Sequence, residues 1–173
     1  MTFEIHSDIT NRSMTVAARA MRRVLRRKRS IIWAIFGWTV FLFNALLLIP
    51  FDGEPFALDA RTLISLLAEV ILLSVLLFQD RFNGMIARKN ALAGTKEYHV
   101  AFGEDSYTVV TAAPTPFRYE LIDALAESQD YIILLMKKRY AQPLDKRTLT
   151  GGTVEEFKRF LEEKTGKTFR RVK

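Results

Sequence analysis

Ile31–Ile49 reads IIWAIFGWTVFLFNALLLI, nineteen residues without a charge and with Asn44 as the one strongly polar side chain. A helix of this length is roughly 29 Å long, close to the ~30 Å hydrocarbon core of a bilayer. In lipid the backbone must satisfy its own hydrogen bonds, which a helix does within one segment. The stretch therefore predicts a membrane-spanning helix.

A second apolar block, Leu63–Phe78, carries Glu69 near its midpoint. Its twelve Leu, Ile, Val and Phe residues, at roughly −0.3 to −0.6 kcal/mol each, outweigh a central acid that costs roughly 3 kcal/mol. We therefore expect it to insert as well. Antiparallel alignment of the two blocks about their centres places Glu69 near Thr39 and Ser65 near Asn44. These four residues form a candidate intramembrane polar site.

The charges around these blocks predict a topology. Residues 1–30 carry eight Lys or Arg against two acids, and basic residues return after the second block, whereas the short segment between the blocks is acidic. The bias of basic residues places both termini in the cytoplasm. We divide the chain into a basic N-terminal segment (1–30), two spanning helices (31–49 and 58–79), a basic connector (80–96) that can extend the second helix, and a cytoplasmic domain (97–173).

The N-terminal segment has two predicted elements. Thr2–His6 alternates between apolar and polar residues, which is typical of a strand, and we expect it to join the cytoplasmic domain with Phe3 and Ile5 pointing inward. From Met14 the apolar residues recur at helical spacing among arginines. Such a helix can lie on anionic headgroups; alternatively, its arginines only set the topology. The candidate headgroup contacts here are Arg22, Arg23, Arg26 and Arg27.

The C-terminal domain is predicted to be rich in antiparallel strands. Tyr131–Met136 is apolar at every position, which favours a central strand or one covered by a helix. Thr153 and Glu156 have the spacing of a capping box, and they begin an amphipathic helix that Gly166 can end. The fold class we expect is α+β: a transmembrane helical hairpin followed by a small β-barrel or curved sheet that the last helix closes.

This arrangement resembles the YcxB-like family of bacterial membrane proteins. The resemblance spans most of the chain and is strongest over Gly94–Lys164. The residues that carry it are Phe102-Gly103-Glu104-Asp105, Phe117-Arg118-Tyr119, Tyr131–Leu135, Gln142–Arg147, Phe157 and Leu161. The resemblance implies a pleckstrin-homology-like (PH-like) domain on a two-helix anchor in the bacterial inner membrane. It implies no enzymatic activity.

The residues offer little for catalysis. The chain has no Cys and only two His, and no phosphate-binding loop or metal-ligand spacing is present in the sequence, so we expect neither an enzyme nor a cofactor. A basic group could gather anions, although a solvated turn is the simpler interpretation. It consists of Lys137, Lys138, Arg139, Lys146 and Arg147. Nucleic acid is not expected, because the domain from Tyr98 onward has only two more basic than acidic residues.

Two functions compete. The leading hypothesis is a membrane-anchored, non-enzymatic binding or scaffold module, whose β domain holds an anionic lipid headgroup, a protein partner or a second copy of the chain. The alternative is a small oligomeric transporter or channel for protons or cations centred on Glu69. The two differ in where polar residues should converge, either in the β domain or around Glu69.

Overall fold

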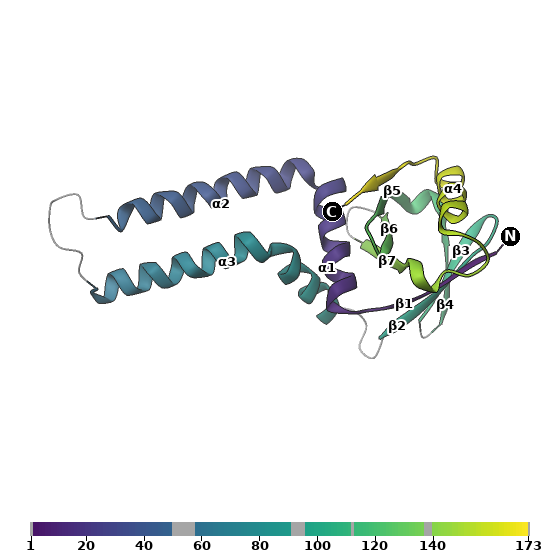
Figure 1. Cartoon of the computed structure of the whole chain (residues 1–173), viewed down its shortest axis with the longest axis horizontal. Helices are drawn as coiled ribbons and strands as arrows, with labels where there is room; N and C mark the ends of the chain where they lie inside the picture. The colour runs from purple at the N-terminus through teal and green to yellow at the C-terminus, as the bar shows by residue number, and fades with distance from the viewer. Residues whose placement is uncertain (1, 50–57, 91–95, 112, 137–139, 173) are drawn as a thin grey trace.

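The structure is a computed structural model, and it describes residues 2–49, 58–90, 96–111, 113–136 and 140–172. Figure 1 shows two long helices side by side at one end of the molecule and the strands at the other, with a short helix between them. The short helix is α1, Asn11–Ala20, which continues as a π-helical turn, η1, Met21–Leu25. The long helices are α2, Arg27–Leu47, and α3, Ala60–Lys89.

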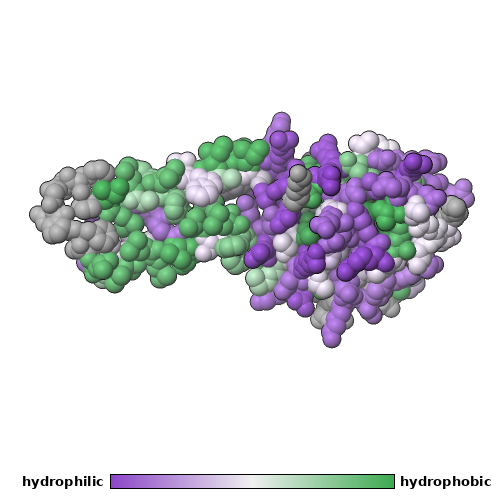
Figure 2. Space-filling model, in the orientation of Figure 1, coloured by the Kyte–Doolittle hydropathy of each residue, from purple (hydrophilic) through white to green (hydrophobic). Residues whose placement is uncertain are grey.

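Both predicted spanning segments are helical over most of their length, from residue 31 to 47 and from residue 60 to 79. Asp59 caps α3, because its side chain accepts a hydrogen bond of 2.8 Å from the backbone nitrogen of Thr62. The helix then continues past the apolar block to Lys89, so the first part of the basic connector is an extension of α3. Figure 2 shows that the visible face of the helical hairpin is mainly hydrophobic, whereas the end with the strands is mainly hydrophilic.

The helical backbone is broken at two residues near the same end of the hairpin, one just before α2 and one within α3. Arg26 (φ −111°, ψ 21°) separates η1 from α2, and Phe78 (φ −108°, ψ 16°) lies inside α3 with non-helical angles. These interruptions allow α1 and the last part of α3 to change direction. In Figure 1 both segments lie together between the hairpin and the strands.

The first sheet has four antiparallel strands in the order β1-β2-β3-β4. They are β1, Phe3–Asp8; β2, Glu97–Phe102; β3, Ser106–Val110; and β4, Pro114–Arg118. The N-terminal strand therefore belongs to the β domain, with Phe3 paired to Phe102 and Ile5 to Val100. Phe3 and Ile5 are buried, as predicted. This prediction is confirmed.

One of the strands predicted from the sequence is wrong. We expected a strand over Phe117–Leu121 after a loop at Pro114 and Pro116, but these prolines lie in β4 and Tyr119–Leu121 is a 3-10 turn. The reason is the position of β4 at the edge of its sheet. A proline has no N–H to donate, and an edge strand has one side on which no ladder bond is needed.

The second sheet also has four strands, in the order β7-β6-β5-β8. They are β5, Ile122–Glu127; β6, Tyr131–Met136; β7, Tyr140–Asp145; and β8, Phe169–Arg171. β6 is central and antiparallel to both neighbours, whereas β8 is parallel to β5. The strand β8, close to the C-terminus, was not predicted.

The α+β class is confirmed, but the described strands form two sheets and not one closed barrel. β1 and β7 lie beside each other without a continuous ladder. Ser7 accepts a hydrogen bond of 2.9 Å from the backbone nitrogen of Asp145, and Glu4 forms an isolated bridge with Thr150. After these contacts the chain leaves β7 through the 3-10 turn η3, Lys146–Thr148.

Side chains from both sheets and from the last helix, α4, Val154–Thr165, form one core. The capping box of Thr153 and Glu156 is present, and Gly166 follows the helix in the left-handed conformation (φ 65°). Phe157 is fully buried, with its ring centroid 4.8 Å from that of Phe102. The apolar side of α4 therefore packs into the β domain, which we define as the two sheets, their 3-10 turns and α4.

Candidate functional site

The helices meet the β domain at what we call the junction, which consists of α1, η1 and residues 80–89 of α3. Gly84 brings the two backbones together, because a Cβ at this position would lie 2.6 Å from the backbone nitrogen of Thr15 and 2.7 Å from its Cα. Nearby, Arg88 donates a hydrogen bond of 3.1 Å to the side-chain oxygen of Asn11. A side chain at position 84 would have to push α1 and α3 apart.

Asp80 supplies a buried charge to the junction, with 12% of its side chain exposed. Arg22 binds it through two hydrogen bonds, Nε to Oδ1 at 2.7 Å and Nη2 to Oδ2 at 2.6 Å. The Nε of Arg19 lies 3.4 Å from Oδ2. The hydrogen bond to Asp80 raises the pKa of Arg22, so the arginine stays charged. Removal of either partner would leave a poorly solvated charge, which is more costly than loss of an exposed pair.

The other face of α1 and η1 covers the second sheet. Ala20 and Met21 are buried in one apolar cluster with Ile133 and Leu135 of β6. The prediction that Tyr131–Met136 is central or covered by a helix is confirmed, and the covering helix is α1. The apolar stripe, which a helix lying on headgroups would turn towards lipid, therefore contacts protein.

A cleft of about 1250 Å³ opens between the junction and the second sheet. Its walls come from α1, from α3 beyond its interruption, from the turn between β5 and β6, and from β8. Five basic side chains and two carboxylates line it, an excess of three positive charges. They are Arg12, Arg19, Arg81, Lys146, Arg171, Glu127 and Asp130. We call this space the basic cleft.

Some of these charges bind one another. Arg12 pairs with Asp130 at 2.5 Å, and Lys146 pairs with Glu127 at 2.6 Å. Arg81 and Arg171 are exposed and form no ion pair with the carboxylates that the structure describes; Arg81 lies over the ring of Phe78. These two guanidinium groups are the cations of the cleft that remain available to a ligand.

Glu127 fixes the position of two lysines, of which Lys146 lines the cleft. Burial acts to raise the pKa of Glu127, but hydrogen bonds from Lys146 and Lys158 outweigh it, so the pKa lies below the ordinary value. Because the folded-state pKa is lowered, the stabilisation is present at neutral pH and is lost as the pH falls through that pKa. At neutral pH the carboxylate thus holds Lys146 and Lys158 in place.

A second opening, of about 480 Å³, lies between the two sheets and is apolar. Its walls include Tyr98, Phe117 and Met136, and no charged side chain lines it among the residues described. An anion would lose its hydration there without a compensating charge. The basic cleft is therefore the better place for an anionic ligand.

The basic residues singled out in the sequence are distributed differently from our expectation. Lys146 lies in the cleft, whereas Arg147 binds Asp145 through two hydrogen bonds of 3.0 and 2.6 Å. Arg23 and Arg27 are exposed beside Arg22, around a shallow pocket of about 360 Å³, and Arg26 is exposed as well. Lys137, Lys138 and Arg139 lie outside the described residues.

The candidate intramembrane site is not assembled by hydrogen bonds. Glu69 is 7% exposed, and neither of its carboxylate oxygens has a hydrogen-bond partner among the described residues. The close approach of Gly37 to Leu76 sets the register of the antiparallel helices. Seven residues from that contact on each helix, Asn44 lies level with Glu69, whereas Thr39 is exposed elsewhere. Ser65, which lies one turn before Glu69 in α3, is half-buried.

Comparison with known protein families matches residues 102–161 to the model described as YcxB-like protein. The resemblance to the YcxB-like family is confirmed. The match covers 60 of the 173 residues and runs from the end of β2 into α4. Comparisons with curated proteins and with solved structures give no match.

The YcxB-like segment supplies only one wall of the basic cleft. Glu127, Asp130 and Lys146 lie within it, but Arg12, Arg19, Arg81 and Arg171 come from outside. The cleft therefore depends on how the helices pack against the YcxB-like segment.

Sequence reasoning missed most of the cleft. The sequence groups Arg12 and Arg81 only with the charges that flank the apolar blocks and gives Arg171 no role, because these positions are separated by about 70 to 90 residues and only the packing of α1 brings them together. Gly84 and Asp80 were the available signals. A glycine and an acid within an otherwise basic helical extension are typical of a close helix contact and a paired charge.

Gly84→Ala should disrupt the junction, because the added methyl group meets the backbone of Thr15, which cannot rotate away. Gly37→Ala is the matched control. Its methyl group would lie 2.6 Å from Cδ2 of Leu76, the end of a flexible side chain. We expect Gly84→Ala to lower the melting temperature of the full-length protein in detergent clearly more than Gly37→Ala does. Equal effects would contradict the close contact at Gly84.

Proposed function

We propose that the chain is a membrane-anchored, non-enzymatic binding module in which α2 and α3 span the bacterial inner membrane and the β domain lies at its cytoplasmic surface. The basic cleft would bind an anionic lipid headgroup. The observation that carries the proposal is the position of the cleft, which lies directly beyond the apolar part of α3, between the helices and the β domain.

The apolar surface of the hairpin supports the anchor. α2 and α3 have mean hydropathies of 1.9 and 2.2 over their most apolar windows, and only 0% and 6% of these windows is buried by the rest of the chain. A core helix of a soluble protein would be mostly covered. Helices of 21 and 30 residues, at ~1.5 Å per residue, are long enough for a ~30 Å hydrocarbon core.

Strand pairing supports the same-side topology. β1 precedes α2, β2 follows α3, and the two strands pair along their length from Phe3–Phe102 to Asp8–Glu97. If both helices span the membrane, the two termini must therefore lie on one side. Basic residues at this end of the hairpin favour the cytoplasmic side.

The architecture of the β domain supports a PH-like fold. Two four-stranded sheets share one core, and α4 places Phe157 and Leu161 into that core from the C-terminal part of the chain. The YcxB-like segment covers β3 to β7 and most of α4. We propose that α4 closes one end of this domain while α1 covers the outer face of the second sheet.

The charges of the cleft favour an anionic headgroup over a neutral ligand. Arg81 follows the interruption at Phe78 by three residues, so it would lie at the level of the headgroups when the apolar part of α3 is in the hydrocarbon. A cation near an anionic surface contributes about 1 kcal/mol to binding. A guanidinium group also offers a planar pair of donors to a phosphate.

The transport hypothesis depends on Glu69, and the structure gives it less support. A carrier site needs polar groups that converge on the acid, but none of the described side chains hydrogen-bonds to its carboxylate. Polar and charged groups converge at the basic cleft instead. We therefore favour the anchored module.

The topology can be tested with single cysteines, because the chain has none. Leu58 lies just before α3 and Lys167 follows α4, and both are exposed. In intact spheroplasts, a membrane-impermeant thiol reagent should label Leu58→Cys and should label Lys167→Cys only after lysis. Labelling of Lys167→Cys before lysis would contradict the cytoplasmic position of the β domain.

The cleft can be tested with the double variant Arg81→Gln/Arg171→Gln. Loss of two cations worth about 1 kcal/mol each should weaken binding of phosphatidylglycerol by roughly tenfold or more. Affinity is measured by titrating the lipid into the full-length protein in neutral detergent and following its melting temperature, with phosphatidylcholine as the neutral reference.

The matched control is Arg118→Gln/Arg159→Gln, which removes two exposed arginines that do not line the cleft. It should bind phosphatidylglycerol as the unaltered protein does. Equal weakening in both double variants, or no preference for phosphatidylglycerol, would contradict the headgroup site and leave the topology test unaffected.

A further inference from the structure

The outer face of β1 and β2 brings together the chain's two histidines and three carboxylates. The register of the strands places His6 opposite His99 and Asp8 opposite Glu97. Glu4, two residues from His6, is on the same face because side chains alternate along a strand. All of these side chains are on the surface, away from the basic cleft.

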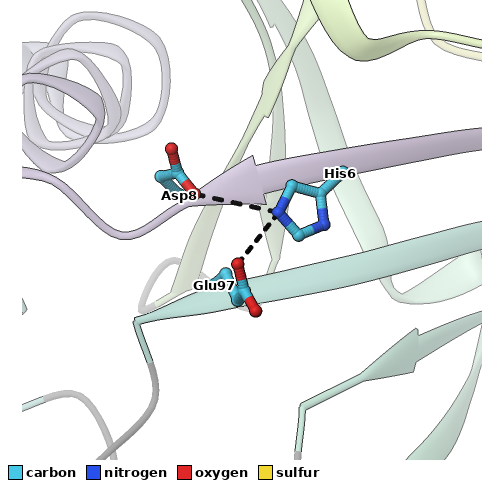
Figure 3. Close-up of side chains that lie close together, drawn as sticks. All are labelled: His6, Asp8 and Glu97. Atoms are coloured by element: carbon cyan, nitrogen blue, oxygen red, sulfur yellow. Dashed lines mark hydrogen bonds and ion pairs between the residues drawn. The ribbon is translucent and has the colours of Figure 1, made fainter.

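Three of these residues already converge on one point. Figure 3 shows the ring of His6 between the carboxylates of Asp8 and Glu97. The Nε2 of His6 lies 3.1 Å from Oε2 of Glu97 and 3.8 Å from Oδ1 of Asp8. One nitrogen and two oxygens, all within 4.8 Å of one another, thus come from two strands.

This geometry fits a zinc-like cation. Zn²⁺ binds imidazole nitrogen and carboxylate oxygen at about 2.0–2.2 Å with tetrahedral geometry, so neighbouring ligand atoms lie about 3.3 Å apart. The contacts of His6 lie on either side of that value. A mixed imidazole and carboxylate set favours Zn²⁺ over Mg²⁺ or Ca²⁺, which prefer oxygen ligands alone.

We infer that His6, Asp8 and Glu97 form a binding site for Zn²⁺ or a similar divalent transition metal, with His99 beside it as a fourth ligand. The Nε2 of His99 lies 3.5 Å from Glu4, and rotation of the half-exposed ring towards its cross-strand partner His6 would bring it to the metal. This site is independent of the proposed lipid site.

Because of the position of the site, a bound metal would also stabilise the structure locally. Asp8 is the last residue of β1, two positions before Thr10 caps α1, and Glu97 is the first residue of β2. Next to them, the backbone nitrogen of Ile9 donates a hydrogen bond of 2.7 Å to the carbonyl of Lys96. A bound metal would hold together the two segments through which the chain leaves the β domain for the helices and returns.

The test uses the full-length protein in detergent, purified with an affinity tag that contains no histidine and then treated with a chelator. Isothermal titration with ZnCl₂ should give one saturable site per chain, and zinc should raise the melting temperature. Loss of a group that only orients a ligand costs about 10–100-fold in metal affinity, so His6→Gln and Asp8→Asn/Glu97→Gln should weaken binding at least tenfold. His99→Gln should weaken it less.

The control is Asp105→Asn, which alters an exposed acid in the turn between β2 and β3 and should bind zinc as the unaltered protein does. Without metal, the melting temperatures of the His6→Gln and Asp8→Asn/Glu97→Gln variants should match that of the unaltered protein, because His6, Asp8 and Glu97 are exposed. Absence of a saturable site would overturn the inference. So would zinc binding that His6→Gln leaves intact, the result expected for an adventitious ion only.

Discussion

The two hydrogen bonds between Arg22 and Asp80 join segments 58 residues apart, one entering the helical hairpin and one leaving it. Together with the close approach at Gly84, they hold α1 against the end of α3. The opposite side of α1 and η1 is buried against β6 through Ala20 and Met21. The attachment of the hairpin to the β domain therefore depends on one short helix that is packed on two sides.

This packing explains why a basic helix is needed at the junction. The arginines of α1 and η1 point in different directions: Arg22 and Arg19 towards Asp80, and Arg12 towards Asp130 in the turn between β5 and β6. α1 thereby brings cations next to Arg81 and Arg171, which come from distant parts of the chain. A β domain without α1 would keep Glu127 and Lys146 but would lose one wall of the cleft. The proposed lipid site is thus a property of the junction and not of the YcxB-like segment alone.

The features that the sequence predicted well depend on local patterns. The apolar stretch Ile31–Ile49, the capping box at Thr153 and the alternation of Thr2–His6 each reflect neighbouring residues, and each element is present where the structure describes it. The errors concern contacts between distant segments. The arginines of α1 were consistent with contact to headgroups or with a role in topology alone, whereas its small residues are buried against β6, and only a tertiary contact decides which side is covered. The cleft was missed for the same reason.

The central claim is that Arg22 and Asp80 couple α1 to α3, and a double-mutant cycle tests it most directly. Arg22→Gln, Asp80→Asn and the double variant would be compared by equilibrium unfolding of the full-length protein in one detergent. If the pair forms as described, the free-energy losses should be non-additive, with a coupling on the order of 1 to 3 kcal/mol. Losses that add to within about 0.3 kcal/mol would show that the two side chains do not interact, and would contradict the account.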